Sequence, residues 1–457
     1  MTTISSAKKI YIVGIGGIGT SALAQLLAAD GARVVGEDIA QSPVTEMLTS
    51  HGIDVWFETN PLAIAEVDVL IHSSAVPHDH PSRAFARENG IPEYTYFEAL
   101  GQYARQFEHV IAVSGTHGKT TTTALIANLL VDAGLNPTAV VGSIVKEFGN
   151  QNSRHGSADK KYFVVEACEH EAHFLLLRPT MAVITNIEAD HLDYYRDLDH
   201  IVETFQTFVN ALPENDAARL IVNADDSRAR SLTTHARRVT YGIEQVADIQ
   251  ALDVGNEAGR QFFTVANHAY TLHVPGAFNV SNSLAAIALG TELGIAYEVM
   301  ERSLSAFHGT WRRFERVGEF HDAVVISDYA HHPTAVRATI RAAKEFFPGK
   351  RIVAVFQPHQ RARTKELFTE FTQSFIEADV VIIQEVYDVA GREESQYADI
   401  SSQHMIDALK DAEGQVALFT KTAADTKQEL ENIVDSNDIV LVMGAGDIYT
   451  LATTLVK

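Results

Sequence analysis

Residues 109–134 read HVIAVSGTHGKTTTTALIANLLVDAG, and this stretch decides the fold class. Its β-branched start predicts a buried strand and its end predicts a helix, with a glycine-containing turn between them. Such a turn aims backbone N–H groups and the positive end of the helix at a phosphate, while Lys119 reaches the β- and γ-phosphates and Thr120 offers a hydroxyl to Mg²⁺. The stretch is therefore typical of an ATP-type phosphate loop, with binding expected from Gly115, Thr116, His117, Gly118, Lys119, Thr120 and Thr121. Because the spacing GxxGKT is shorter than the full pattern, a plain glycine turn with a solvated lysine is the alternative interpretation.

The alternation of predicted strands and helices continues on both sides of this stretch. Short apolar runs alternate with helical patterns along the chain, which predicts an α/β fold with parallel sheets covered by crossover helices. From the points where one series of strands and helices ends and the next begins, we expect three domains, over residues 1–106, 107–314 and 315–457. Within the second, residues 261–275 (QFFTVANHAYTLHVP) alternate around turn residues and predict an antiparallel hairpin.

The composition is that of an ordinary folded chain. Its 457 residues are 46% apolar and 21% charged, and the length alone predicts about three domains. The 36 basic and 59 acidic residues give a net charge of −23, which argues against binding of nucleic acid. The single cysteine, Cys168, allows no internal disulfide and lacks the signature of a catalytic thiol. With no signal-peptide pattern and no long apolar run, we expect a cytoplasmic protein that does not enter the membrane.

A second glycine-rich turn lies near the N-terminus, where residues 10–19 read IYIVGIGGIG. The helix expected after this turn ends at Gly31, which suits a left-handed cap. Glycines in this position admit a pyrophosphate to a helix N-terminus, and an acid at the end of the next strand binds a ribose. The pattern fits a nicotinamide dinucleotide and a UDP-linked compound equally, and glycines that serve only helix packing are a further alternative. The residues concerned are Gly14, Gly16, Gly17, Gly19 and Asp38.

Polar side chains follow several other predicted strands, at the end of a sheet where ligands bind in open α/β folds. A carboxylate near the phosphate loop can complete the coordination of Mg²⁺, and arginine forks suit phosphate and carboxylate oxygens. Each residue alone is as well explained by a satisfied polar side chain or a solvated arginine. The candidates are Glu166, Asn186, Glu188, Asp190, His191, Asp193, Arg312, Arg313, Asp328, Tyr329, His331, His332, His359, Arg361 and Arg363.

Taken in order along the chain, the motifs resemble those of the Mur ligases, the ATP-dependent amide-forming enzymes of peptidoglycan precursor synthesis. The likeness spans essentially the whole sequence. The motifs that carry it are VGIGGIG (13–19), HSSAVP (72–77), SGTHGKTTTT (114–123), VEACE (165–169), TNIEADHLD (185–193), PGAFNVSN (275–282), GTWRRFE (309–315), DYAHHPT (328–334), FQPHQRART (356–364), EVY (385–387) and GAGD (444–447).

The resemblance implies a Rossmann-like N-terminal domain for a UDP-sugar, a central phosphate-loop ATPase domain and a Rossmann-like C-terminal domain that brings the amino-acid site. It implies transfer of the ATP γ-phosphoryl group to the lactyl carboxylate of UDP-N-acetylmuramate. The amine of L-alanine then attacks the acyl phosphate, and ADP and phosphate are released. It also implies two Mg²⁺ ions, whereas a monomer and a homodimer both remain open.

The resemblance also carries site residues over to this chain. For catalysis they are Lys119, Glu166, His191, Arg313 and His331, of which His331 is the candidate acceptor of the amine proton. For Mg²⁺ they are Thr120, Glu166 and His191, with Glu166 shared by the two ions. For ATP outside the phosphate loop they are Asn279, Asn282, Arg313 and Asp328. For the amino acid and the reacting carboxylate they are His331, His359 and Arg363. For the UDP moiety they are Gly14, Gly16, Gly17, Gly19, Asp38, Ser73 and Ser74.

Three positions depart from the pattern of the family. Phe278 stands where a histidine often precedes the first asparagine, Cys168 replaces an aspartate, and Gln360 replaces an arginine. They bear on the adenine and amino-acid sites, so the amino-acid preference is open. A ligase that adds the murein tripeptide is the alternative activity; a nicotinamide oxidoreductase built on the first glycine turn and a UDP-sugar or ATP sensor without turnover are the alternatives of other classes.

Overall fold

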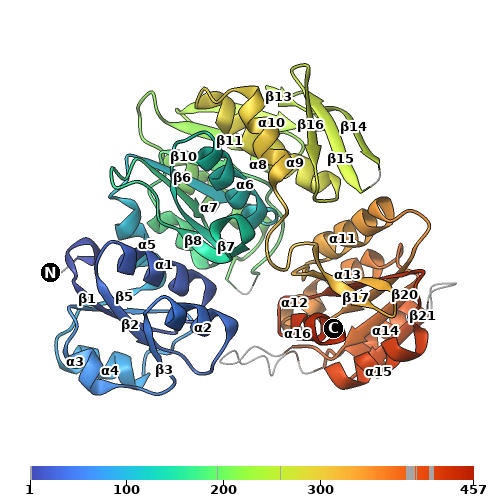
Figure 1. Ribbon diagram of the computed structural model, residues 1–457, viewed down its shortest axis with the longest axis horizontal. Helices are drawn as coiled ribbons and strands as arrows, with labels where there is room; N and C mark the ends of the chain where they lie inside the picture. The colour runs from blue at the N-terminus through green and yellow to red at the C-terminus, as the bar shows by residue number, and fades with distance from the viewer. Residues whose placement is uncertain are drawn as a thin grey trace. The chain divides into compact units, whose positions relative to one another are not determined.

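The structure is a computed structural model that describes residues 3–192, 194–257, 259–387, 397, 399–410 and 416–456. It forms two compact units, and both have the predicted α/β character (Figure 1). Unit 1 comprises Met1–Glu188, Asp197–Gln250 and Ser283–Ser303, and unit 2 comprises Ala189–Arg196, Ala251–Asn282 and Leu304–Lys457. The domain boundaries expected at 106/107 and 314/315 remain a prediction.

The first sheet of unit 1 is a five-stranded parallel sheet in the order β3-β2-β1-β4-β5. Ile10 lies opposite both Val34 and Val69, so β1 is central and apolar. The first helix ends as its sequence predicts, because Gly31 adopts a φ of 96° and the chain turns left-handed there. The elements are η1 (Ile4–Ser6), β1 (Lys9–Val13), α1 (Ile18–Ala29), β2 (Arg33–Glu37), α2 (Pro43–Ser50), β3 (Asp54–Trp56), α3 (Pro61–Ala65), β4 (Val69–His72), α4 (Pro81–Glu88), β5 (Glu93–Thr95) and α5 (Tyr96–Ala104).

The second sheet of unit 1 has eight strands in the order β13-β12-β11-β10-β6-β9-β7-β8, and β8 is antiparallel to its neighbour. Because β6 lies between β9 and β10, the carboxyl ends of these three parallel strands share one edge of the sheet. The elements are β6 (His109–Ser114), α6 (Lys119–Asp132), β7 (Thr138–Val145), η2 (Lys146–Phe148), β8 (Gln151–Arg154), β9 (Tyr162–Glu166), η3 (His170–Leu176), β10 (Met181–Ile184), α7 (Leu198–Asn210), β11 (Arg219–Asn223), α8 (Ser227–Ser231), β12 (Arg237–Gly242) and β13 (Ile249–Gln250).

Unit 2 contains a three-stranded antiparallel sheet, β14-β15-β16, which includes the predicted hairpin. Its six-stranded sheet has the order β17-β18-β22-β19-β20-β21. Alternate residues of β19 enter two apolar layers: Val353 packs with α15 and α16, whereas Ile352 packs with α11, α13 and α14. The elements are β14 (Leu252–Glu257), β15 (Arg260–Val265), β16 (His268–Leu272), β17 (Glu315–Phe320), β18 (Ala323–Asp328), α11 (Pro333–Phe346), β19 (Arg351–Phe356), α12 (Arg361–Glu366), α13 (Phe368–Ser374), β20 (Val380–Gln384), α14 (Ser402–Lys410), β21 (Val416–Thr420), α15 (Ala423–Ile433), β22 (Asp438–Met443) and α16 (Tyr449–Leu455).

Two helices, α9 (Ala277–Glu292) and α10 (Tyr297–Ala306), complete the fold. In the part of the chain that the structure describes, every helix is too short or too polar to cross a bilayer.

A buried amide links the first helix of unit 1 to its second sheet. Asn152 of β8 is fully buried, and its Nδ2 donates to the Ile18 carbonyl and to Ser21 Oγ, the latter at 2.8 Å. Its Oδ1 accepts a hydrogen bond from Gln25 Nε2 at 2.9 Å. All three partners lie on α1, so this side chain fixes the helix that follows the first glycine turn against the second sheet.

We expect Asn152→Ala to lower the free energy of unfolding by at least about 2 kcal/mol, because buried polar groups on α1 lose their partner. Urea unfolding followed by circular dichroism measures this. The matched control is Gln41→Ala, whose exposed side chain bonds Glu46 and should change stability by less than about 0.5 kcal/mol. Equal effects of the two variants would contradict the role of Asn152.

Candidate functional site at the strand ends

The phosphate-loop stretch folds as a strand, a loop and a helix at the predicted positions. β6 ends at Ser114 and α6 begins at Lys119. Gly115 has a φ of 135°, and a Cβ there would lie 2.1 Å from Thr185 Oγ1, so a larger residue does not fit. Gly118, with a φ of 83°, is the N-cap of α6. Since the first turn of a helix leaves backbone N–H groups without helical partners, the loop presents an anion-binding helix N-terminus.

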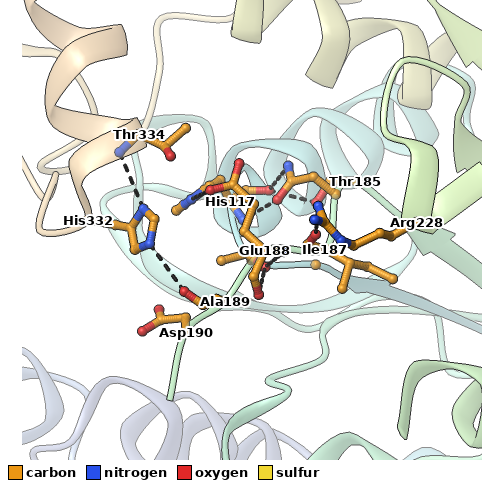
Figure 2. Close-up of polar contacts among 12 residues, drawn as sticks. His117, Thr185, Ile187, Glu188, Ala189, Asp190, Arg228, His332 and Thr334 are labelled. Atoms are coloured by element: carbon orange, nitrogen blue, oxygen red, sulfur yellow. Dashed lines mark hydrogen bonds and ion pairs between the residues drawn. The ribbon is translucent and has the colours of Figure 1, made fainter. Parts of the chain in front are cut away.

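The segment that follows β10 holds this loop in place through hydrogen bonds (Figure 2). Asn186 Oδ1 accepts from the His117 N–H at 2.8 Å, and Thr185 Oγ1 donates to the His117 carbonyl at 2.6 Å. The Glu188 N–H donates to Thr116 Oγ1 at 2.8 Å, and its carboxylate lies 3.4 Å from His117 Nε2. Thr116 and His117, both predicted to bind ATP, are therefore held from the neighbouring strand end.

Lys119 has a buried carboxylate partner. Its Nζ donates to Glu169 Oε1 at 2.8 Å and to the Gly115 carbonyl at 2.6 Å. Burial lowers the pKa of Lys119, but the charge of Glu169, the charges of Cys168 and Glu166 and the hydrogen bond to Glu169 together outweigh it, so the pKa lies above its ordinary value. The lysine is therefore a fixed cation beside the phosphate loop.

Glu166 ends β9 and lies beside Thr120, as the predicted metal pair requires. Its Oε1 accepts from Thr120 Oγ1 at 3.1 Å, and its Oε2 accepts from the Gly142 N–H at 2.7 Å. A Cβ at position 142 would lie 2.5 Å from that carboxylate, so glycine is what allows the approach. A carboxylate and a hydroxyl oxygen side by side are donors that Mg²⁺ prefers. His191 belongs to unit 2, and its pairing with Glu166 stays a prediction.

The first glycine turn is supported by the acid predicted to bind a ribose. The Gly16 N–H donates to Asp38 Oδ2 at 2.7 Å, and the Ile39 N–H donates to Oδ1 at 2.8 Å. Gly14 has a φ of 74°, and a Cβ there would lie 3.0 Å from the Cβ of Ser73. The structure therefore brings Gly14, Asp38 and Ser73 to one edge of the first sheet.

The remaining residues of this turn lie at the start of α1. Gly17 is the N-cap of the helix, and a Cβ at Gly19 would lie 2.6 Å from the ring of Tyr96. Ser74, also predicted to bind the UDP moiety, is exposed after β4. Binding of UDP by the turn stays a prediction.

In unit 2 a buried ion pair organises the predicted amino-acid site. Arg363 donates through Nη2 and Nε to Asp190 Oδ1 at 2.9 and 3.1 Å. Although burial raises the pKa of Asp190, the charge of Arg363 and the neighbouring histidines together keep it well below its ordinary value. Burial and then the charge of Arg363 hold the pKa of His331 well below its ordinary value, so this imidazole is neutral and can accept a proton. The ring of His359 lies 6.4 Å from that of His331, which brings the three predicted residues together.

The histidines around Asp190 have defined positions. His191 has a φ of 55°, and its N–H donates to Asp190 Oδ1 at 2.8 Å. His332 accepts at Nδ1 from the Thr334 N–H at 3.3 Å, and its Nε2 lies 3.3 Å from the Ala189 carbonyl (Figure 2). Asp193, a further candidate of the sequence, lies outside the described residues.

The two adjacent arginines of GTWRRFE have different surroundings. Arg312 is buried and donates to the Gly444 carbonyl at 2.6 Å, so it holds the turn after β22. The guanidinium carbon of Arg313, Cζ, lies 4.9 Å from the centroid of the Tyr329 ring. Asp328, the acid predicted to contact the ATP ribose, accepts from the Phe314 N–H at 2.7 Å, and burial raises its pKa above the ordinary value.

The residues predicted near the adenine are also buried. Asn279 donates to the Pro275 carbonyl at 2.7 Å, and Asn282 donates to Asn279 Oδ1 at 3.2 Å. Phe278, which departs from the family pattern, is 36% exposed beside them. Gln360, another departure, has a φ of 73° and precedes α12.

Several contributions were missed from the sequence. No role was predicted for Glu169, although an acidic residue three positions after Glu166, just beyond the end of a strand, indicates a candidate partner for the phosphate-loop lysine. Asp190 was a candidate, but its pairing with Arg363 was not predicted, because the two residues lie 173 positions apart along the chain. Burial, followed by the charge of Glu169, raises the pKa of Cys168 to about 12, which agrees with the expectation that its thiol is not a nucleophile.

Comparisons with known proteins place this site among a group of related enzymes. Family models match the chain in three stretches: the Mur ligase family, catalytic domain at residues 9–108, the Mur ligase middle domain at 113–290, and the Mur ligase, glutamate ligase domain at 312–446. The chain is 38% identical to a UDP-N-acetylmuramate–L-alanine ligase of Desulforapulum autotrophicum over 453 residues, covering 98% of both chains.

Solved structures also match the chain over nearly its whole length. The structure of a UDP-N-acetylmuramate–alanine ligase of Thermotoga maritima matches with a TM-score of 0.83 at 29% identity, over 98% of each chain. A murein peptide ligase of Psychrobacter arcticus shares the fold with a TM-score of 0.72 at 23% identity, also over 98% of each chain.

We expect Arg363→Met to lower the free energy of unfolding by about 3–5 kcal/mol, because it leaves the Asp190 carboxylate buried without its cation. Urea unfolding at pH 7 measures this. Arg316→Met is the matched control: Arg316 and Glu319 form an exposed pair at 2.8 Å, and the loss should be below about 1 kcal/mol. A loss at Arg363 no larger than at Arg316 would contradict the importance of the buried pair.

Proposed function

This chain belongs to the Mur ligase family, and from that premise we propose that it joins L-alanine to the lactyl carboxylate of UDP-N-acetylmuramate at the expense of ATP. The carboxylate would first take the γ-phosphoryl group, which forms an acyl phosphate and releases ADP. The amine would then attack the acyl carbon, and phosphate would leave as the amide forms. The observation that carries the proposal is the geometry of the phosphate loop, in which Lys119 pairs with Glu169 and Thr120 donates a hydrogen bond to Glu166.

Phosphoryl transfer needs positioning and positive charge more than covalent help from the protein. Lys119 is a fixed cation, and the α6 N-terminus adds backbone N–H groups aimed at phosphate oxygens. From unit 2 the proposal assigns Arg313 to the ATP phosphates, Asp328 to its ribose, and Asn279 and Asn282 to the adenine. Thr121, which is buried in the first turn of α6, completes the ATP-binding set.

The oxygen donors at the loop fit Mg²⁺. The Thr120 hydroxyl and the Glu166 carboxylate would hold one ion, and Glu166 with His191 would hold a second. When bound, Mg²⁺ neutralises charge on the phosphate oxygens. Glu166 is already oriented for this by the Gly142 N–H, so the protein supplies a fixed ligand.

The amine half of the reaction is assigned to unit 2. Arg363 would bind a carboxylate, His359 would line the amino-acid site, and His331 would accept the proton of the attacking amine. The neutral state of His331 supports this role, because only an unprotonated imidazole can act as a base. In the first sheet, the glycine turn with Asp38, Ser73 and Ser74 would bind the UDP moiety.

The alternatives explain less of the molecule. A nicotinamide oxidoreductase leaves the phosphate loop and Glu166 without a role. A sensor without turnover does not need a buried base at His331. A ligase for the murein tripeptide shares the fold, and the amine preference separates it from an L-alanine ligase. A cytoplasmic location, and a monomer or homodimer, remain predictions.

We expect phosphate release only when ATP, Mg²⁺, UDP-N-acetylmuramate and an amine are all present. L-Alanine should exceed glycine by roughly tenfold in kcat/KM, since one methyl group in a pocket is worth about that much. L-Serine and the tripeptide complete the series. Phosphate release that ignores the amine would reject the ligase, whereas a preference for the tripeptide would favour the alternative activity.

We expect Lys119→Met to lower kcat by about 100- to 1,000-fold, because the transferring phosphoryl group loses a preorganised charge. Steady-state phosphate release measures this. Lys161→Met is the matched control, because Lys161 is exposed and lies over the Tyr162 ring at 5.5 Å. An equal kcat in the two variants would remove Lys119 from the mechanism.

A further inference from the structure

A second group of metal-ligand side chains lies in unit 1, outside the residues assigned to ATP and Mg²⁺. His170, Glu171 and His173 belong to the 3-10 helix η3 (His170–Leu176). One ligand atom from each lies within 4.8 Å of the others. His173 Nε2 is 3.5 Å from Glu171 Oε2, so two of the three donors already face each other.

The backbone of this turn is what brings the donors together. Glu171 and Ala172 have φ values of 51° and 56°, which places two consecutive non-glycine residues in the left-handed region. In a regular helix, side chains two positions apart do not face each other. Here the left-handed step turns Glu171 toward His173, while His170 lies three positions before His173 with ring centroids 6.2 Å apart.

The ring of His173 is held in place by an aromatic partner. It stacks on Phe97 of α5 with centroids 3.8 Å apart and an interplanar angle of 10°. A ligand with a fixed ring loses less freedom when it binds an ion.

Two imidazoles and one carboxylate select the kind of ion. Mg²⁺ and Ca²⁺ prefer oxygen donors, whereas Zn²⁺ and Co²⁺ accept nitrogen with oxygen at about 2.0–2.2 Å. The exposed Glu171 side chain can rotate to close the remaining gap. We propose that His170, Glu171 and His173 form a binding site for a divalent first-row transition metal ion, Zn²⁺ or Co²⁺, with water in the remaining positions.

The position of the turn gives such an ion a defined consequence. Glu169, the partner of Lys119, is the residue immediately before His170. An ion on η3 would therefore fix the segment that follows Glu169 and stabilise the folded chain. This inference does not depend on the ligase activity.

The test uses the full chain without a polyhistidine tag, stripped with EDTA and dialysed into buffer with excess Mg²⁺. Co²⁺ is then added, and its visible absorption and equilibrium dialysis report coordination and stoichiometry. We expect one tightly bound Co²⁺, displaced by Zn²⁺, with a rise in unfolding temperature. Glu171→Gln, His170→Gln and His173→Gln should each weaken binding by at least tenfold.

Two controls locate the ion. His155→Gln removes a more exposed histidine that pairs with Asp30 at 2.9 Å, and His117→Gln removes the histidine beside Glu188 in the phosphate loop. Binding should survive both. Because Glu171 is exposed, Glu171→Gln should fold normally, and urea unfolding without metal checks this for every variant. Absence of tight Co²⁺ binding, or equal binding by the three site variants and the wild type, would overturn the proposal.

Discussion

The phosphate-loop site depends on one register, the parallel pairing of β6 with β9 and β10. Val113 lies opposite Glu166, and Ser114 lies opposite Ile184. The Ala167 N–H therefore donates to the Val113 carbonyl at 2.8 Å, and the Thr185 N–H donates to the Ser114 carbonyl at 3.0 Å. Side chains alternate between the faces of a sheet, so a slip of one residue in β9 would turn the Glu166 carboxylate away from Thr120.

Local rules were enough to predict the elements of this arrangement. The strand, loop and helix of residues 109–134, the hairpin within 261–275 and the helix end at Gly31 each follow from periodicity or turn chemistry over a few residues. The α/β class and the membership in the Mur ligase family were predicted from the sequence and are confirmed. The resemblance paired Thr120 with Glu166, and the two side chains lie within hydrogen-bond distance, whereas their binding of Mg²⁺ stays a prediction.

Partners distant in sequence could not be predicted in this way. Arg312 and Arg313 have the same chemistry and adjacent positions, yet Arg312 holds backbone carbonyls near Gly444 while Arg313 lies over Tyr329. The buried pair of Asp190 and Arg363 likewise depends on tertiary packing. The left-handed backbone at Glu171 occurs without a glycine, so the turn in η3 could not be predicted from the sequence.

The net charge of −23 is compatible with anionic ligands because the relevant cations act locally. Lys119 and Arg363 each have a buried carboxylate partner. A cation paired in this way adds little net charge, so a phosphate at the loop would share Lys119 with Glu169. The α6 N-terminus adds to the attraction, because its backbone dipoles carry no counterion of their own. The glycines at 115 and 118 therefore contribute to anion binding alongside the lysine, since they give the backbone the geometry that presents those dipoles.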